Sequence, residues 1–187
     1  MNNTELEGIL TFIKEAENLK NTLRFAFTSK GRQESSAEHT WRLCLLLLVC
    51  ACRLPHLHLE KLLKLAVIHD LAEAVCGDTP AISRTDHAAK TALERRALTR
   101  LLRPLSGRLK EQILDLWEEY ESAATEEARC VKAFDKLETL VQHNQGVNPP
   151  GFDYAFNLEY GIAATAEINV ASQLRKLIDS DTKKHIR

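Results

Sequence analysis

The sequence predicts an all-α protein built as a single domain. Apolar residues recur at spacings of three and four along most of the chain, which is the period of a helix that buries one face. The 187 residues include only 7 Gly and 5 Pro, and no low-complexity tract or linker divides them. A chain of this length and composition can bury one sizeable core, so one domain spanning residues 1–187 is expected. No segment shows the two-residue alternation that is typical of a half-buried strand.

The first predicted helix is amphipathic, and its apolar positions are Ile9, Phe12, Ile13, Ala16 and Leu19. Residues 21–34 follow without a helical period and are expected to be irregular. Ser35 and Glu38 then match a capping box, in which the serine hydroxyl and the glutamate carboxylate each accept a free backbone amide. A second helix is therefore predicted to begin there and to run to about Arg53.

The rest of the chain is also expected to be helical. Pro55 begins a connector, and Gly77 is a suitable residue for ending the helix that follows it. Thr125 precedes two glutamates, as at the start of a helix. After Arg53, helices are predicted over residues 59–77, 87–102 and 105–122, and another begins at residue 125. A Pro-Pro-Gly break at 149–151 precedes the last predicted helix, at roughly 158–178.

Charge and cysteine content limit the possible partners and compartments. The net charge is −1, and the basic residues are scattered, so neither a nucleic-acid polymer nor a membrane surface is an expected partner. The apolar run 43–52 is too short for a membrane span, which needs about 20 residues. The five cysteines contain no CxxC pair and are expected to be free thiols. No signal peptide is apparent, and a cytoplasmic location is expected.

Four ionisable residues lie where the helical pattern predicts apolar ones. His69 and Asp70 directly follow the apolar run 65–68, and Asp135 lies beside the apolar stripe of its helix. His39 is expected in the first turns of the second helix, at the edge of the core. Burying a carboxylate is costly unless it is paired or binds a metal. Two imidazoles and two carboxylates suit a divalent transition metal such as Mn, Fe, Co, Ni or Zn.

Each of these residues also has an ordinary structural explanation. His39 alone would be a surface residue near a helix start, and Asp135 alone would pair with Lys132 or Lys136. Four such positions in order are harder to explain as independent accidents. Glu73 follows Asp70 by three residues and therefore faces the same site, as an acid or base. The histidines without such a context are expected to be surface or incidental residues: His56, His58, His87, His143 and His185.

The motifs around these residues resemble the HD phosphohydrolase superfamily, whose signature is His, His-Asp and Asp on separate helices. The match is closer to the bacterial 5′-deoxynucleotidases and their eukaryotic HD-domain-containing relatives. It covers about Leu19 to Val141, and residues 146–187 are read as a C-terminal helical extension. The matching motifs are Ala37-Glu38-His39-Thr40-Trp41-Arg42, Ile68-His69-Asp70-Leu71-Ala72-Glu73, Gly77-Asp78-Thr79-Pro80 and Phe134-Asp135-Lys136-Leu137-Glu138.

This resemblance implies hydrolysis of a nucleoside monophosphate to a nucleoside and phosphate, by a dimeric enzyme. It implies one divalent metal bound by His39, His69, Asp70 and Asp135. Arg24 would then bind the phosphate and Phe25 would form an apolar wall. Glu73 would assist proton transfer, and Asp78 would position the water or the sugar. The relatives carry Trp at the place of Phe25, so the choice between deoxyribose and ribose stays open.

Three other functions are compatible with the same residues. The metal set would also serve an HD hydrolase of another phosphate ester or nucleotide. A non-catalytic helical module that binds a metal or a nucleotide is the second, although Arg24, Glu73 and Asp78 would be superfluous in it. In the third, the polar residues form a buried network in a purely structural protein.

Overall fold

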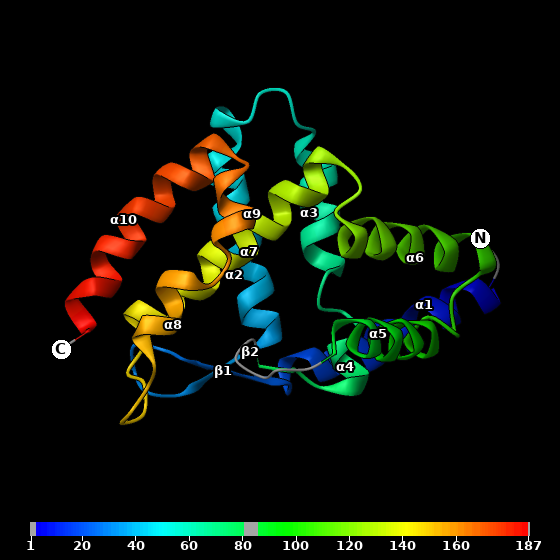
Figure 1. Cartoon of the computed structure of the whole chain (residues 1–187). Helices are drawn as coiled ribbons and strands as arrows, with labels where there is room; N and C mark the ends of the chain where they lie inside the picture. Colours follow the sequence, from blue (N-terminus) through cyan, green and yellow to red (C-terminus); the bar gives the residue numbers. More distant parts are fainter. Residues whose placement is uncertain (1–2, 81–85, 187) are drawn as a thin grey trace.

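The computed structural model describes residues 3–80 and 86–186, and helices account for most of this part of the chain (Figure 1). The predicted all-α class is confirmed. A two-stranded sheet is the sole sheet within the described ranges. In chain order the elements are α1 (Asn3–Ala16), η1 (Glu17–Lys20), β1 (Leu23–Phe27), β2 (Gln33–Ser35), α2 (Ser36–Cys50), η2 (Ala51–Arg53), α3 (Leu59–Ile68), α4 (Glu73–Cys76), α5 (His87–Leu101), α6 (Gly107–Ser122), α7 (Glu126–Gln145), α8 (Tyr154–Glu159), α9 (Ile162–Ala166) and α10 (Asn169–His185).

The predicted capping box begins α2. The Ser35 side chain accepts the Glu38 amide, and the Glu38 carboxylate accepts the Ser35 amide at 2.9 Å. Thr125 caps α7 in a similar way, with its hydroxyl accepting the Ala128 amide at 3.2 Å. Both helix starts therefore lie where the sequence predicts them, because these caps are local interactions.

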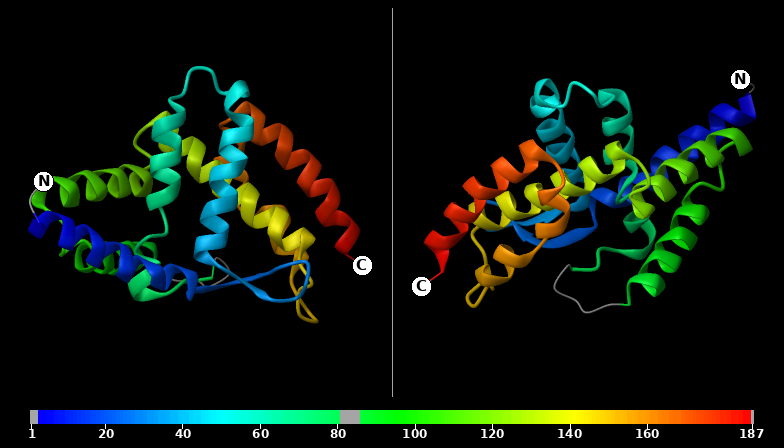
Figure 2. Two further views of the ribbon diagram at one scale, coloured as in Figure 1. Left: turned by 180° about the vertical axis from the view of Figure 1, so that it is seen from behind. Right: turned by 45° about the horizontal axis from the view of Figure 1, so that its top comes forward.

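Helix α7 is the central element of the fold. It contacts α2, α3, α6, α9 and α10, and Figure 1 shows it crossing the middle of the molecule. One hydrophobic core lies around it, with Phe134 and Leu137 of α7 fully buried. A second core joins α4, α5 and α6 and includes Trp117. Both views in Figure 2 place α1 and α10 at opposite ends of the molecule.

Residues 21–34 are not irregular as predicted, because most of them form an antiparallel hairpin. Leu23 of β1 pairs with Ser35 of β2, and Phe27 pairs with Gln33. The hairpin is fixed to α7, where Gln142 Nε2 donates to the Phe27 carbonyl at 2.5 Å. Its strands are five and three residues long, too short to show a clear alternation in the sequence.

Two other predicted helix boundaries are wrong. Helix α3 ends at Ile68 rather than near Gly77, and tight i to i+3 bonds carry the chain into the separate α4. The single helix predicted over 158–178 is replaced by α8, α9 and α10. The break between α8 and α9 is at Gly161, whose φ is +72°. This left-handed conformation favours glycine and interrupts a helix.

The apolar run 43–52 belongs to α2 and η2 and packs in part against the first core. Across the ranges 3–80 and 86–186, no helix combines the length and apolar character that a membrane span requires.

Candidate metal centre and active site

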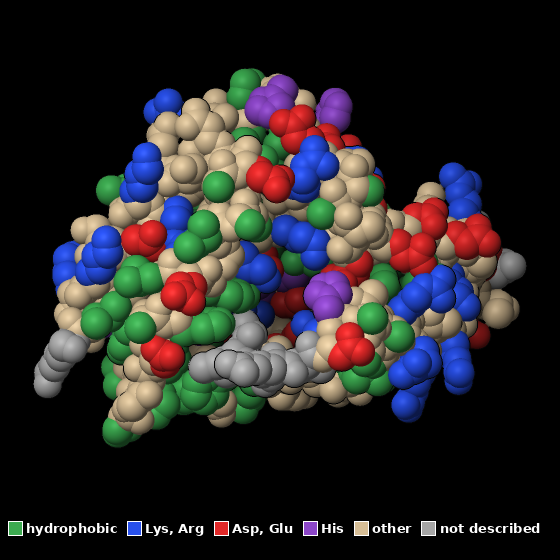
Figure 3. All heavy atoms as spheres, viewed as in Figure 1, with side chains coloured by type: hydrophobic (Ala, Val, Ile, Leu, Met, Phe, Trp, Pro, Cys, Tyr) green, Lys and Arg blue, Asp and Glu red, His purple; other side chains and the backbone are tan. Residues whose placement is uncertain are grey.

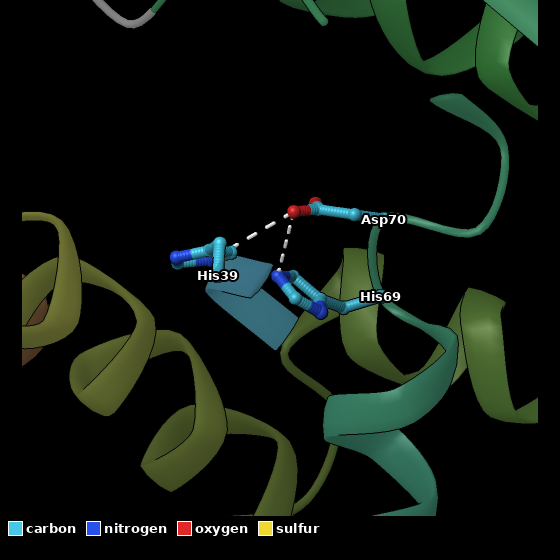
Figure 4. Close-up of side chains that lie close together, drawn as sticks. All are labelled: His39, His69 and Asp70. Carbon is cyan, nitrogen blue, oxygen red and sulfur yellow. Dashed lines mark ion pairs between the residues drawn. The ribbon is translucent and has the colours of Figure 1, made fainter. Parts of the chain in front are cut away.

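Three of the predicted metal ligands meet at the end of α3. His39 comes from α2, and His69 and Asp70 come from the turn after α3 (Figure 4). Asp70 Oδ2 lies 3.0 Å from His69 Nε2 and 3.8 Å from His39 Nε2. One potential ligand atom from each residue lies within 4.8 Å of the others. The three side chains thus converge on one point.

Asp135 of α7 reaches this cluster through His39. Its Oδ1 lies 3.1 Å from His39 Nε2, although Asp135 is not part of the group of mutually close ligand atoms. Its other oxygen, Oδ2, accepts the Tyr120 hydroxyl at 3.1 Å and Lys136 Nζ at 2.9 Å. The structure therefore brings all four predicted ligands into one neighbourhood, with one carboxylate oxygen of Asp135 turned towards His39.

The two imidazoles present the atoms that a metal needs. His39 Nδ1 contacts the Glu138 carboxylate, and His69 Nδ1 contacts the Ala66 carbonyl at 2.7 Å. Both Nε2 atoms are buried and face carboxylate oxygens, Asp135 Oδ1 at 3.1 Å from His39 and Asp70 Oδ2 at 3.0 Å from His69. Metal-binding histidines commonly pair one ring nitrogen with a carboxylate or a carbonyl and use the other as the ligand. The residues present therefore fit a divalent metal.

The expected position of His39 at the edge of the core is wrong. Its side chain is fully buried, even though it lies in the first turns of α2. Glu138 of α7 covers one side of the ring and also accepts Arg42 Nε at 2.5 Å. Glu138 was not among the predicted site residues, although Glu138 follows Asp135 by three residues, just as Glu73 follows Asp70.

Glu73 and Asp78 are carboxyl groups with raised pKa values. Glu73 is 4% exposed, and its Oε2 accepts the Ser36 hydroxyl at 2.6 Å. Burial and the negative charges of Asp70 and Asp78 raise the pKa of Glu73 to about 9. Burial, with the charge of Asp70, also raises the pKa of Asp78, and the two carboxyl groups are close enough for a hydrogen bond. Burial and these charges therefore favour the protonated form of Glu73.

Arg24 extends from β1 towards the cluster. Its Nη1 donates to Asp70 Oδ2 at 3.3 Å, and its Nη2 donates to the Thr139 hydroxyl at 3.0 Å. Lys90 of α5 and Lys136 of α7 line the same cavity as Arg24. Three cations from three elements thus surround the carboxylates, an arrangement suited to binding a phosphate.

One cavity is lined by the carboxyl groups and cations described above, whereas His39 and His69 are not among its lining residues. Figure 3 shows a hollow near the middle of the face, with acidic side chains in it and basic side chains around it. The enclosed volume of this cavity is about 130 Å³, and the cavity opens to solvent. Beyond the polar residues its wall is aromatic, formed by Phe25, Phe152, Phe156 and Tyr160. The last three come from a segment in which the sequence analysis placed no site residue.

His143 is not the surface residue that was expected. It is 7% exposed and lines the cavity, and its Nδ1 lies 2.9 Å from Asn157 Oδ1. Its ring meets Phe152 edge-on, with centroids 4.9 Å apart. The other four histidines of that group are exposed, as expected.

Comparisons with known proteins agree with this geometry. The HD domain family matches residues 16–175, a range that extends past Val141. The protein named 5′-deoxynucleotidase hdd1 of Schizosaccharomyces pombe is 36% identical over 148 residues, which cover 76% of this chain and 74% of that protein. The 5′-deoxynucleotidase HDDC2 of Danio rerio is 30% identical over 142 residues, covering 75% of this chain and 70% of that one.

The fold also resembles solved structures. A predicted metal-dependent phosphohydrolase from Magnetospirillum magnetotacticum superimposes with a TM-score of 0.83, covering 97% of this chain and 95% of that chain. The two sequences are 24% identical, so this likeness concerns the fold alone. The PH0347 protein from Pyrococcus horikoshii gives a TM-score of 0.66 at 25% identity, covering 95% of this chain and 98% of that one.

Proposed function

Because the chain belongs to the HD domain family, we propose that it is a metal-dependent phosphomonoesterase acting on nucleoside or deoxynucleoside 5′-monophosphates. The observation that carries this proposal is the convergence of the buried Nε2 atoms of His39 and His69 on the carboxylate oxygens of Asp135 and Asp70, at 3.1 and 3.0 Å. They lie next to a cavity that also contains Glu73 and Arg24. The relatives named 5′-deoxynucleotidase support the substrate class.

His39, His69, Asp70 and Asp135 would hold the metal, which we propose to be one divalent ion of Mn, Fe, Co, Ni or Zn. When bound, such an ion supplies Lewis acidity, which activates water and offsets the charge of a phosphate. The chain itself fixes the ligands. Glu138 and the Ala66 carbonyl orient the two imidazoles, and Tyr120 and Lys136 hold Asp135 Oδ2. A preorganised site of this kind needs little rearrangement to bind its ion.

Arg24 would bind the phosphate of the substrate. Its guanidinium presents several donors in a fixed plane, which suits phosphate oxygens. Thr139 already holds Nη2 in place at 3.0 Å. Lys136 and Lys90 add positive charge along the same cavity. Phe25, which follows Arg24 in β1, would contact the sugar that is attached to the phosphate.

Glu73 would act as the general acid. Its raised pKa favours the protonated form, so it can donate that proton to the 5′ oxygen as the phosphorus–oxygen bond breaks. Water supplies the oxygen that joins phosphorus, and the products are a nucleoside and inorganic phosphate. Asp78, within hydrogen-bonding reach of Glu73, would orient it and the attacking water or the sugar.

Substitution of a single ligand tests the proposal. We expect Asp70→Ala to lose bound metal and phosphate release together, because Asp70 Oδ2 lies within 4 Å of the Nε2 atoms of both imidazoles. Metal content by elemental analysis and phosphate release from ribo- and deoxynucleoside monophosphates measure the two effects. Wild-type protein stripped of metal and reloaded with each candidate ion identifies the active one. Phosphate release by a folded, metal-free Asp70→Ala protein would contradict the assignment.

The same substrate panel decides between the alternatives. Nucleoside triphosphates and simple phosphate esters are included in it. Preferential hydrolysis of either group would assign the chain to an HD hydrolase of another substrate class. Bound metal without any hydrolysis would favour a binding module. Wild-type protein without any bound metal would favour a structural protein with a buried polar network.

We also propose that the chain is a cytoplasmic homodimer. An exposed apolar stripe on α2, formed by Trp41, Leu45, Leu48 and Val49, supports a second copy as its partner, since stripes of this kind commonly mark protein interfaces. The five free cysteines are consistent with a reducing compartment. Light scattering of the wild type and of Leu48→Glu tests the dimer, and cell fractionation tests the location.

A further inference from the structure

The candidate active-site cavity has an aromatic end as well as a polar one. Two segments far apart in the sequence supply it, since one ring comes from β1 and three come from in or next to α8. We call these four residues the aromatic wall: Phe25, Phe152, Phe156 and Tyr160. The catalytic roles proposed above for the polar residues do not require the three rings of the α8 segment.

The rings of the aromatic wall form two nearly parallel pairs. The centroids of Phe25 and Phe152 are 6.1 Å apart, with an interplanar angle of 16°. Those of Phe156 and Tyr160 are 5.4 Å apart, at 28°. Phe25 is 44% exposed, which is high for a large apolar ring beside a cavity. The wall therefore offers flat apolar surface to a ligand.

Arg175 of α10 holds the aromatic wall in place. It is 6% exposed and donates to the carbonyls of Asn157, Leu158 and Tyr160 at 2.9, 2.7 and 2.7 Å. These carbonyls belong to the end of α8 and would otherwise lack helix partners. A wall fixed in this way needs little ordering when a ligand binds, and such preorganisation favours affinity.

The aromatic wall adjoins the polar end of the cavity directly. Lys136 Nζ lies 2.9 Å from Asp135 Oδ2 and 5.1 Å from the centroid of the Tyr160 ring. Phe25 immediately follows Arg24, whose guanidinium is 3.3 Å from Asp70. A phosphate bound at the polar end would thus place the group attached to it along the aromatic rings.

We propose that the aromatic wall binds the nucleobase of the substrate by stacking, an inference that rests on the proposed function. Every nucleobase presents a flat π face to aromatic side chains, and removing one stacking partner typically weakens binding by roughly 10- to 100-fold. The wall accordingly selects nucleoside monophosphates over phosphate esters that lack a base. In this assignment, residues of the C-terminal extension take part in substrate recognition.

The experiment compares kcat/KM for deoxyadenosine 5′-monophosphate and for 2-deoxyribose 5-phosphate, which lacks the base. We expect Phe152→Ala and Phe156→Ala to lower the value for the nucleotide by roughly 10- to 100-fold, with a far smaller loss for the sugar phosphate. Phe12→Ala is the control, because Phe12 of α1 packs against the second core and is not among the residues that line this cavity. It should leave the ratio of the two values unchanged.

An unchanged ratio in both folded variants would overturn the proposal. If the wild type hydrolyses neither compound, the proposed function fails, and calorimetric binding of the same two compounds to metal-loaded protein decides the role of the wall. Stacking on the wall is supported if the wild type binds the nucleotide more tightly than the sugar phosphate and if Phe152→Ala abolishes this difference. Equal binding of both compounds to the wild type overturns it.

Discussion

Glu138 supports His39 from the side opposite the candidate metal position. Its Oε2 contacts His39 Nδ1, and its Oε1 accepts Arg42 Nε at 2.5 Å. A carboxylate on one ring nitrogen fixes the orientation of an imidazole and makes the other nitrogen a stronger ligand. Glu138 would therefore act on the metal through His39 without touching it.

We expect Glu138→Gln to weaken metal binding by roughly 10- to 100-fold, as is typical when such a supporting group is lost. Glutamine keeps the size of the side chain and removes the charge that holds the imidazole. Titration of metal-stripped protein against a competing chelator measures the affinity. Glu118→Gln is the control, because Glu118 carries the same charge but pairs with Arg95 at the surface. Equal metal affinity in wild type and folded Glu138→Gln would rule out this role.

Site residues that interrupt a helical pattern could be predicted from the sequence. Site residues whose place in the cavity depends on long-range contacts could not. His69, Asp70 and Asp135 stand out because each replaces an apolar residue at or beside a buried stripe. Phe152 has no such signal, since an aromatic residue after a Pro-Pro-Gly turn fits many environments. Its place in the cavity depends on how the α8 segment packs against α7 and β1. His143 was missed for the same reason.

Gly161 controls how closely the segment containing α8 approaches α7. A Cβ atom at this position would lie 2.7 Å from Lys136 Cβ, and the φ of +72° is already unfavourable for other residues. We expect Gly161→Ala to lower the free energy of unfolding by about 1–3 kcal/mol, from backbone strain plus the clash. It should also lower kcat/KM, because Lys136 lies beside Asp135. Denaturant unfolding and phosphate release measure the two effects.

Gly151→Ala separates the two causes. Gly151 has a φ of +81°, but nothing lies within 4 Å of its Cβ position, so that variant carries the backbone strain without the clash. It should lose about 1 kcal/mol of stability and keep its activity. The same losses in both variants would mean that the contact with Lys136 has no consequence.

At the scale of elements, local signals predicted where helices begin better than where they end. The caps at Ser35 and Thr125 involve residues three apart, so the sequence alone contains them. The end of α3 at Ile68 and the hairpin of β1 and β2 depend on partners elsewhere in the fold. Thr22 illustrates this, because its hydroxyl donates to the Glu73 carbonyl at 3.1 Å, across 51 residues of sequence. Such contacts have no signature in a local window.

At the scale of the whole molecule, the candidate metal centre connects elements that are distant in the sequence. His39 lies in α2, His69 and Asp70 follow α3, and Asp135 lies in α7. The first core packs around α2, α3 and α7, and the second includes Ile68, the residue directly before His69. A bound ion would thus link helices that separate when either core unfolds. Metal binding should therefore stabilise the entire fold.

We expect this linkage to appear in the melting temperature. A ligand present at about 100 times its Kd, and bound only by the folded state, adds about 2.7 kcal/mol to the free energy of unfolding. For a domain of this size that corresponds to a rise of roughly 5–10 °C in Tm. Calorimetric melts of metal-stripped and reloaded protein measure the rise, and Asp70→Ala should show almost none. Identical Tm values for stripped and saturated wild-type protein would mean that the ion does not bind at the junction of these helices, because binding to the folded state alone must raise the Tm.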